Sequence, residues 1–156
     1  MKPDSLLSHL GYQGPNILLL LILLMLYYQH YTQPYFYLAV VGWQLASHFL
    51  NVVIKNTLKA PRPDDSPNKT LVQPTFKNYL IVHRQYGMPS GHAQAVCSEL
   101  IFIALFFRKP WLTTLAFLQT ALTLWQRYAY KRHSIKQLAV GSILGLTVGA
   151  LFYYLL

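Results

Sequence analysis

The chain has 156 residues and a mass of 18.0 kDa, which is enough for one domain. Hydrophobic residues make up 54% of it, charged residues only 11%, and the mean hydropathy of +0.30 favours a membrane protein over a soluble domain. The net charge of +9 suits anionic lipid headgroups or a phosphorylated substrate. Basic residues lying between apolar runs argue against a nucleic-acid partner. Cys97 is the only cysteine, which excludes a disulfide framework and a cysteine-based metal site.

Apolar runs predict an all-α integral membrane bundle of about five transmembrane helices, forming one domain over residues 1–156. Residues 1–16 are expected to be a polar leader, which Gly14-Pro15 separates from the first helix. A signal peptide is the competing interpretation, but Gln29-His30-Tyr31-Thr32 offers no small-residue cleavage site, so a retained helix is favoured. The expected spans cover approximately residues 15–31, 35–54, 91–107, 111–128 and 135–156, with one long loop at 55–90.

The second expected helix carries a polar stripe made of Gln44, Ser47, His48 and Asn51, which continues to Lys55. A polar stripe in a membrane helix faces protein or water and avoids lipid. Hydrogen bonding between helices is favoured as its role over direct catalysis by His48.

Two features inside other expected helices point to close packing. Gly141, Gly145 and Gly149 are spaced four apart and predict a groove that another helix can approach closely. Glu99 is the only acidic residue in any expected span, and a buried carboxylate should be neutral or paired. Structural pairing of Glu99 is favoured over a catalytic role.

Five spans would bring three polar segments to the same membrane face, because alternate helix ends meet on one side. These segments are Lys55–Pro63, Tyr86–His92 and Arg127–Gln137. The short turns 29–34 and 108–110 would lie on the opposite face. The sequence therefore predicts a single site assembled from the three segments.

The three segments carry cations and hydrogen-bond donors that suit phosphate. Lys55 supplies a point charge, while Arg62 and Arg127 each offer a planar fork for two phosphate oxygens. Ser90 can donate from its hydroxyl, and Gly91 lets the backbone come close to a ligand at a helix start.

Two histidines complete this chemistry. His92 could protonate a leaving oxygen, and a neutral His133 is a competent nucleophile toward phosphorus if an acceptor holds its other nitrogen. Gln137, one turn later, can offer a carbonyl oxygen for that purpose. Each group alone has a common structural explanation, such as a helix cap or an anchor to lipid headgroups, but together they supply what phosphoryl transfer needs.

The order and spacing of these residues resemble the type 2 phosphatidic acid phosphatase (PAP2) superfamily. Its signature is Lys-x6-Arg-Pro, then Pro-Ser-Gly-His, then Ser-Arg-x5-His-x3-Asp. The signature is matched at Lys55, Arg62, Pro63, Pro89, Ser90, Gly91, His92, Arg127 and His133. The resemblance implies a PAP2-like helical core and a hydrolase that uses no metal and no cofactor. It also implies a phosphohistidine at His133, with His92 as acid and then base, and phosphate held by Lys55, Arg62, Ser90, Gly91 and Arg127.

Two positions depart from that signature. Gln126 replaces the serine, a change expected to matter little. Gln137 replaces the aspartate that orients the nucleophile. Losing that carboxylate removes charge stabilisation of the imidazolium, so slower chemistry or a pseudoenzyme is an open alternative. The sequence motifs Tyr86-Gly87-Met88-Pro89-Ser90 and His133-x3-Gln137 are similar to those of the dolichyl diphosphatase branch. That similarity implies a polyprenyl diphosphate substrate cleaved at its terminal phosphate.

Two alternatives and the membrane orientation stay open. The protein could be a phosphatidate-type lipid phosphate monoesterase, or a non-catalytic membrane protein that binds lipid phosphate. Cations gather on the site face, which by the positive-inside rule would be cytoplasmic. The resemblance instead implies a lumenal or exoplasmic site, in the endoplasmic reticulum or plasma membrane, and this orientation is favoured because several of those cations are needed for phosphate.

Overall fold

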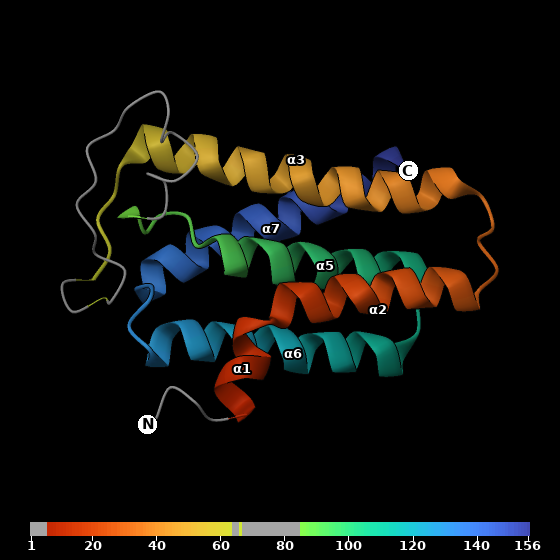
Figure 1. The fold of residues 1–156 in the computed structure, drawn as a ribbon, viewed down its shortest axis with the longest axis horizontal. Helices are drawn as coiled ribbons and strands as arrows, with labels where there is room; N and C mark the ends of the chain where they lie inside the picture. The colour runs from red at the N-terminus through yellow and green to blue at the C-terminus, as the bar shows by residue number, and fades with distance from the viewer. Residues whose placement is uncertain (1–5, 64–65, 67–84) are drawn as a thin grey trace.

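The computed structural model describes residues 6–63, 66 and 85–156, and it is helical throughout these residues apart from turns and one short backbone bridge (Figure 1). The all-α prediction is confirmed. The part of the predicted loop at 64–65 and 67–84, with Arg84 in it, lies outside the described residues. The helices are α1 (Leu6–Tyr12), α2 (Gly14–Tyr28), α3 (Pro34–Leu58), α5 (Gly91–Phe107), α6 (Pro110–Ala129) and α7 (Ile135–Leu155).

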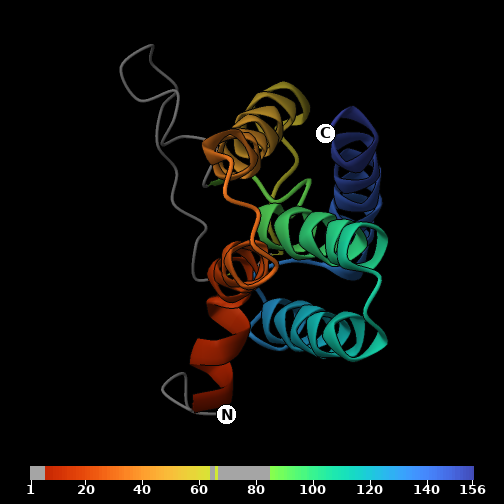
Figure 2. The same ribbon diagram turned by 90° about the vertical axis from the view of Figure 1, so that its right-hand side faces the viewer.

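Helix α5 lies at the centre of the bundle, where it contacts α2, α3, α6 and α7 (Figure 2). Successive long helices run in opposite directions. As a result, α3 and α6 end, and α5 and α7 begin, at the same end of the bundle, on the left in Figure 1. The polar segments are therefore carried by helix ends that meet.

Prolines and serines set several of the helix starts. Pro34 and Pro110 stand in the first turns of α3 and α6, where the missing N–H costs no hydrogen bond. Ser90 caps α5, and Ser134 caps α7 in a reciprocal capping box with Gln137. The two serine caps fix where the helices that carry the candidate site begin.

The predicted start of the long loop at residue 55 needs correction, because α3 continues to Leu58. Lys55 therefore belongs to the last turn of the helix, where a cation interacts favourably with the free carbonyl groups. The helix ends with Lys59 in the left-handed conformation at φ 47°, and Ala60 is disfavoured in a helix because Pro61 follows it.

The predicted polar leader also needs correction, because α1 is a helix over Leu6–Tyr12. The pair α1 and α2 is bent by 66° at the break before Gly14-Pro15. Leu6, Leu7 and Leu10 are exposed, whereas Ser8 and Gly11 are buried against the bundle. The leader is thus a short helix with an apolar outer face and a small-residue inner face.

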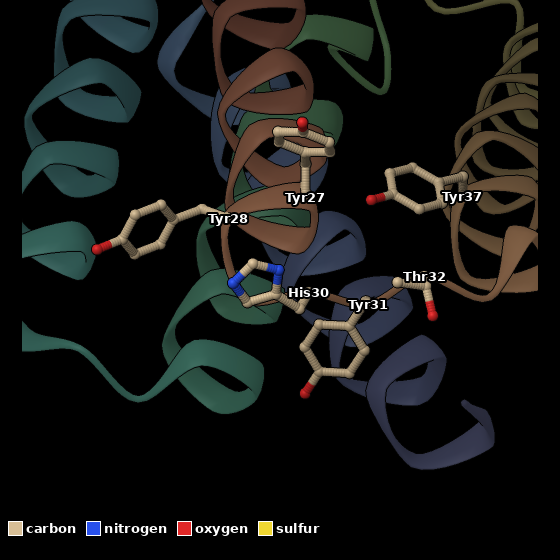
Figure 3. Close-up of a pocket in the computed structure, with 6 residues that line it drawn as sticks. All are labelled: Tyr27, Tyr28, His30, Tyr31, Thr32 and Tyr37. Atoms are coloured by element: carbon tan, nitrogen blue, oxygen red, sulfur yellow. The ribbon is translucent and has the colours of Figure 1, made fainter.

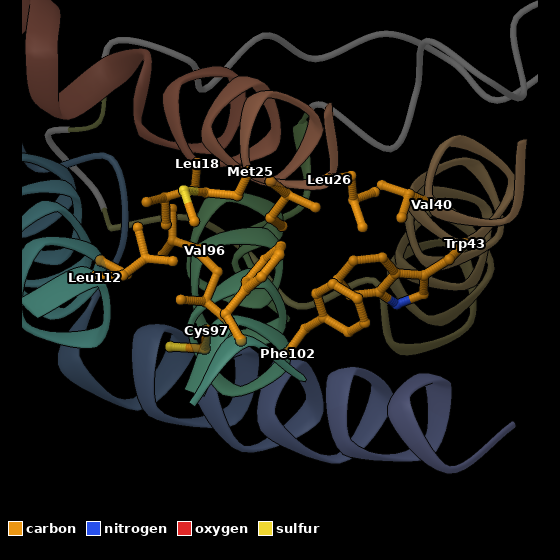
Figure 4. Packing of buried hydrophobic residues seen from close by; sticks show 13 residues of the cluster. Leu18, Met25, Leu26, Val40, Trp43, Val96, Cys97, Phe102 and Leu112 are labelled. Carbon is orange, nitrogen blue, oxygen red and sulfur yellow. The ribbon is translucent and has the colours of Figure 1, made fainter. Parts of the chain in front are cut away.

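The apolar core fills the space between α2, α3, α5 and α6 (Figure 4). Ile22, Leu26, Val96 and Phe102 in this cluster are fully buried. Many large apolar side chains of the same helices are instead exposed on the outside of the bundle, as expected for a surface in contact with lipid.

Two helices among the described residues, α3 and α7, are long and apolar enough to cross a membrane, and the bent pair α1–α2 would make a third. Helix α5 is apolar but shorter, with 17 residues. These helices support a membrane protein, while the expected number of about five spans stays a prediction.

A ladder of polar side chains joins α3 to α5 inside the bundle. Gln44 donates to Glu99 at 2.7 Å, Asn51 donates to the Gln94 side chain at 2.6 Å, and Gln94 donates to the Ser47 hydroxyl at 2.9 Å. The predicted hydrogen bonding between helices is confirmed. Glu99 is paired through Oε1, while its buried Oε2 has no hydrogen-bond partner.

The prediction that His48 belongs to that buried polar stripe is wrong. Its side chain is exposed on the outer side of α3, whereas Ser47, Asn51 and Lys55 are buried.

The glycine groove on α7 is occupied by α5, as predicted. A methyl group at Gly141 would lie 2.5 Å from the Ser90 carbonyl oxygen, and methyl groups at Gly145 and Gly149 would meet the Gln94 and Ser98 carbonyls. The backbones of α5 and α7 therefore pack directly against each other. This contact holds the start of α7, and with it His133 and Gln137, beside the start of α5.

Replacing Gly145 with alanine should force the two helices apart, because a rigid carbonyl group cannot move aside. We expect a loss of about 1–3 kcal/mol in the free energy of unfolding, which lowers Tm by roughly 2–4 °C per kcal/mol for a chain of this size. Thermal unfolding in detergent would measure it. The matched control is Gly42→Ala in α3, where nothing lies within 4 Å of the added methyl group. An equal Tm for both variants would contradict the packing role of Gly145.

Candidate active site

The predicted site residues gather at the end of the bundle where α3 and α6 finish and α5 and α7 begin (Figure 1). The intervening backbone segments are joined to each other. Gly87 N–H donates to the Ala60 carbonyl at 2.8 Å, and Pro61 and Tyr86 form an antiparallel bridge. The segments before α5 and after α3 are therefore held together as one platform beneath α7.

Arg62 connects the first segment to the third. Its Nη1 donates to the Arg132 carbonyl oxygen at 2.7 Å and lies 3.4 Å from Nε2 of His133. Burial, together with the charge of Arg132, lowers the pKa of Arg62 to about 10, so its guanidinium is still charged at neutral pH. Arg62 thus places positive charge beside the predicted nucleophile.

The hydrogen bonds of His133 determine which ring nitrogen carries the proton. Nδ1 lies 2.9 Å from the Gly87 carbonyl oxygen and 3.3 Å from Oε1 of Gln137. Both partners can only accept, so Nδ1 carries the hydrogen and Nε2 presents a lone pair toward Arg62. This is the tautomer that nucleophilic attack through Nε2 requires.

The surroundings of His133 strongly favour its neutral form. Burial, followed by the charges of Arg62, Lys55 and Arg127, lowers its pKa from the usual 6.5 to about 2. Of these cations, Arg62 is in direct contact with the ring, with Nη1 3.4 Å from Nε2. At physiological pH His133 is an unprotonated base in a positive environment.

Besides its capping contact to the Ser134 hydroxyl, Gln137 makes four polar contacts that link three segments. Its Oε1 accepts from the backbone N–H of Ser134 at 3.2 Å and faces Nδ1 of His133, and its Nε2 donates to the Pro61 carbonyl at 2.7 Å. Its own carbonyl accepts from the backbone N–H of Ser90 at 3.1 Å. An aspartate at this position could not donate to Pro61, so the amide ties the Arg62 segment to the histidine.

Ser90 and Gly91 lie at the start of α5, beneath the third segment. The Ser90 hydroxyl oxygen accepts from the Ala93 N–H at 3.4 Å as the helix cap, and its side chain is fully buried. A methyl group at Gly91 would lie 3.2 Å from Oδ1 of Asn51, so the absent side chain lets α3 pack closely. Both residues therefore have a structural role, while their predicted role in binding phosphate stays a proposal.

His92 and Arg127 form a pair next to this helix start. Nη2 of Arg127 donates to Nε2 of His92, since a guanidinium has no acceptor. The guanidinium carbon of Arg127 lies 4.8 Å from the ring centroid of Tyr12, and the Tyr12 and His92 ring centroids are 5.3 Å apart. His92 therefore accepts a hydrogen bond in this state, and Tyr12 belongs to its surroundings.

The charges at this end of the bundle are not balanced by acidic residues among those described. Lys55, Arg62 and Arg127 are only 5%, 8% and 4% exposed. Glu99 is the one acidic residue in the described part of the chain, and it pairs with Gln44, eleven residues before Lys55 and about 16 Å away along α3. Lys55 and Arg127 are buried cations with no carboxylate near them among the described residues, a costly arrangement that suits an anionic ligand.

Arg127 offers one further sign of such a ligand. Its Nε–H group is buried and has no hydrogen-bond partner, although buried donors are nearly always paired. A phosphate oxygen is an acceptor that this group could bind. Among the described residues, no three His, Cys, Asp or Glu side chains gather where they could hold a metal ion.

Among the cavities lined by described residues, two lie at opposite ends of the bundle. One of about 610 Å³ includes His133 in its wall, and the other residues that line it are Pro63, Tyr128, Ala129, Lys131, Ser134, Ile135 and Lys136. The other, of about 720 Å³, lies at the turn between α2 and α3 and contains none of the predicted site residues (Figure 3). Its lining of Tyr27, Tyr28, His30, Tyr31, Thr32 and Tyr37 resembles the aromatic belt of a membrane interface.

Sequence reasoning missed four groups that contact the predicted residues. Three are backbone carbonyls, those of Gly87, Pro61 and Arg132, whose directions depend on how the loops pair and which no residue type reveals. The fourth is Tyr12. The Gly14-Pro15 break that follows it was the only local signal that the chain turns there.

A comparison with protein-family models matches residues 34–156 to the model described as PAP2 superfamily. Searches of curated proteins and of solved structures found no match. The match covers most of the chain and includes α3, α5, α6 and α7, which carry the site described above. The chain therefore belongs to the PAP2 superfamily, whose members are phosphatases that act on lipid phosphates.

Proposed function

We propose that the protein hydrolyses the terminal phosphate of a polyprenyl diphosphate, of the dolichyl type, through a phosphohistidine at His133 and without a metal. Superfamily membership supports phosphatase-type activity. The single observation that carries the mechanism is the buried, neutral imidazole of His133, whose unprotonated Nε2 lies 3.4 Å from Arg62 within a cluster of buried cations. Nucleophile and charge are thus already assembled.

In the first step, Nε2 of His133 forms a bond to the terminal phosphorus while the bond from phosphorus to the bridging oxygen breaks. The imidazole becomes positively charged, and its Nδ1–H keeps the Gly87 carbonyl and Gln137 Oε1 as acceptors. Lys55, Arg62 and Arg127 neutralise the phosphoryl oxygens, and the unpaired Nε–H of Arg127 gains an acceptor. The departing group is the lipid monophosphate.

In the second step, water attacks the phosphohistidine and releases inorganic phosphate, restoring His133. His92 would take the proton of that water and pass it to solvent, once the bound phosphate draws Arg127 away from the Nε2 lone pair that it occupies here. The balanced reaction consumes one water and yields lipid monophosphate and phosphate.

The state of His92 favours a diphosphate over a phosphatidate-type monoester. A monoester leaves as an alkoxide, which needs a proton from a general acid, whereas a phosphate leaving group is a much weaker base. With Arg127 donating to it, His92 is poorly placed to supply a proton in the first step. The cavity beside His133, with Tyr128, Ala129 and Ile135 in its wall, would give the lipid an apolar surface next to the nucleophile.

We place the site on the lumenal or exoplasmic side. Lys55, Arg62 and Arg127 are buried around His133, so they serve the site and should not be counted as topology signals. When these three cations are left out of the count of Lys and Arg on each membrane face, the positive-inside rule gives less support for a cytoplasmic site.

His133→Ala should abolish phosphate release, because no other described group presents an unprotonated nitrogen beside Arg62. We expect kcat to fall by on the order of 10³-fold or more. The assay offers purified protein in detergent, with EDTA, polyprenyl diphosphate and phosphatidate separately and measures released phosphate.

The matched control is His48→Ala, since His48 is exposed on the outer side of α3 and should keep wild-type activity. Release from phosphatidate alone would favour a monoesterase, and no release from either lipid would favour a lipid-phosphate-binding protein. Activity retained by His133→Ala would overturn the proposed nucleophile.

The protonation of His133 gives a second prediction. Because its pKa is lowered to about 2, the ring should stay neutral, with hydrogen on Nδ1, throughout the range from pH 8 to 5. ¹⁵N NMR of histidine-labelled protein measures this directly, and the signal missing from His133→Ala identifies the resonance. Conversion to the imidazolium within that range would contradict the proposed electrostatics.

Gln137→Leu should slow the first step without preventing it. The variant loses one acceptor for the imidazolium and the tie to Pro61, while the Gly87 carbonyl still orients the ring. A hydrogen bond to a charged group is worth about 1.5–3 kcal/mol, so we expect kcat to fall roughly tenfold to a hundredfold. Steady-state phosphate release measures kcat, and a wild-type rate would show that Gly87 alone suffices.

A further inference from the structure

We propose that Tyr12 is a positioning residue of this active site, and that its ring face holds the Arg127 guanidinium in line with His92 and the bound phosphate. The inference rests on the proposed function for its activity measurement. Tyr12 lies before residue 34, where the match to the family model begins. It therefore adds α1, an element outside the matched region, to the site.

The contacts of Tyr12 connect it to both partners at once. The Arg127 guanidinium carbon lies 4.8 Å above its ring, within the range of a cation–π contact, and the His92 ring centroid is 5.3 Å away at an angle of 45°. The Tyr12 main chain is also hydrogen-bonded to His92. Tyr12, Arg127 and His92 form a closed group of three.

The position of Tyr12 is imposed by close packing of α1 against α6. A methyl group at Gly11 would lie 2.7 Å from Cβ of Gln126, one residue before Arg127, so the two backbones approach directly. Nε2 of Gln119 donates to the Leu10 carbonyl at 2.9 Å. At the following bend, a methyl group at Gly14 would meet the Thr123 hydroxyl. Three successive turns of α6 thus hold the end of α1.

The geometry leaves the hydrogen-bonding edge of Arg127 available. A guanidinium donates in its own plane, and the Tyr12 ring lies against its carbon atom at 4.8 Å and takes up none of its N–H groups as a hydrogen-bond acceptor. One N–H is directed to His92, and the buried Nε–H has no hydrogen-bond partner. Without the ring, the guanidinium would keep its charge but lose the surface that fixes the direction of these donors. Tyr12 is 50% exposed, so it forms the outer wall of this part of the site.

The experiment compares Tyr12→Leu, which removes the aromatic face, with Tyr12→Phe, which keeps it and removes only the hydroxyl. For polyprenyl diphosphate, Tyr12→Leu should lower kcat/KM roughly 2- to 30-fold, the range of a cation–π contact, whereas Tyr12→Phe should stay within about twofold of wild type. The matched control is Tyr27→Leu, an exposed tyrosine at the opposite end of the bundle, which should have no effect.

A second measurement keeps the inference testable if the proposed substrate is wrong. Binding of inorganic phosphate, followed by calorimetry in detergent, should weaken in Tyr12→Leu and not in Tyr12→Phe. If wild-type protein releases no phosphate from the diphosphate yet shows this binding pattern, the proposed function fails and the role of Tyr12 stands. If the enzyme is active and both variants match wild type in both measurements, Tyr12 has no positioning role.

A purely structural contribution of Tyr12 predicts a different result. Both variants would then lower Tm together, and the folded protein would keep its affinity for phosphate. Gly11→Leu provides an independent test, because it should displace α1 from α6 while leaving Tyr12 unchanged. Its loss of kcat/KM should match that of Tyr12→Leu, and the double variant should lose little more. Full additivity of the two losses would overturn the inference.

Discussion

Buried positive charge is the constraint on which this structure depends. Lys55 and Arg127 lie at one end of an apolar bundle, and the one acidic residue in the described part of the chain lies far from Lys55, between α3 and α5. Such an arrangement is unfavourable by itself and becomes favourable when an anion arrives. Burial, together with the same charges, lowers the pKa of His133 and keeps it neutral, so the environment that attracts phosphate also maintains the nucleophile that attacks it.

The apolar bundle makes this arrangement possible by fixing helix ends with backbone contacts. The glycines of α7 lie against carbonyl groups of α5, and Gly11 and Gly14 let α1 and α2 approach α6 closely, mainly against its side chains. Close backbone packing leaves few alternative positions for the helices. Lys55 and Arg127 are therefore held in place by the rigidity of α3 and α6, while Arg62, beyond the end of α3, is held by its hydrogen bond to the Arg132 carbonyl.

Much of the site could be predicted from sequence, because its side chains belong to three short patterns and alternating helices bring their ends together. The orientation of the nucleophile could not be predicted in full. Gln137 was expected to hold Nδ1 of His133, yet the nearer acceptor is the Gly87 carbonyl, whose direction follows from the pairing of Gly87 with Ala60. The sequence did not predict that Tyr12 lies beside Arg127 and His92, because its position depends on the bend between α1 and α2.

The carbonyl of Gly87 also affects which substitutions such a site can tolerate during evolution. A backbone acceptor is present whatever side chain a mutation introduces, so the shorter hydrogen bond to His133 is not at risk from substitution elsewhere. Residue 137 can then differ in charge, glutamine here in place of the aspartate of the superfamily signature, while the imidazole keeps its orientation. The backbone secures the tautomer, and the side chain at 137 is left to adjust how strongly the charged intermediate is stabilised.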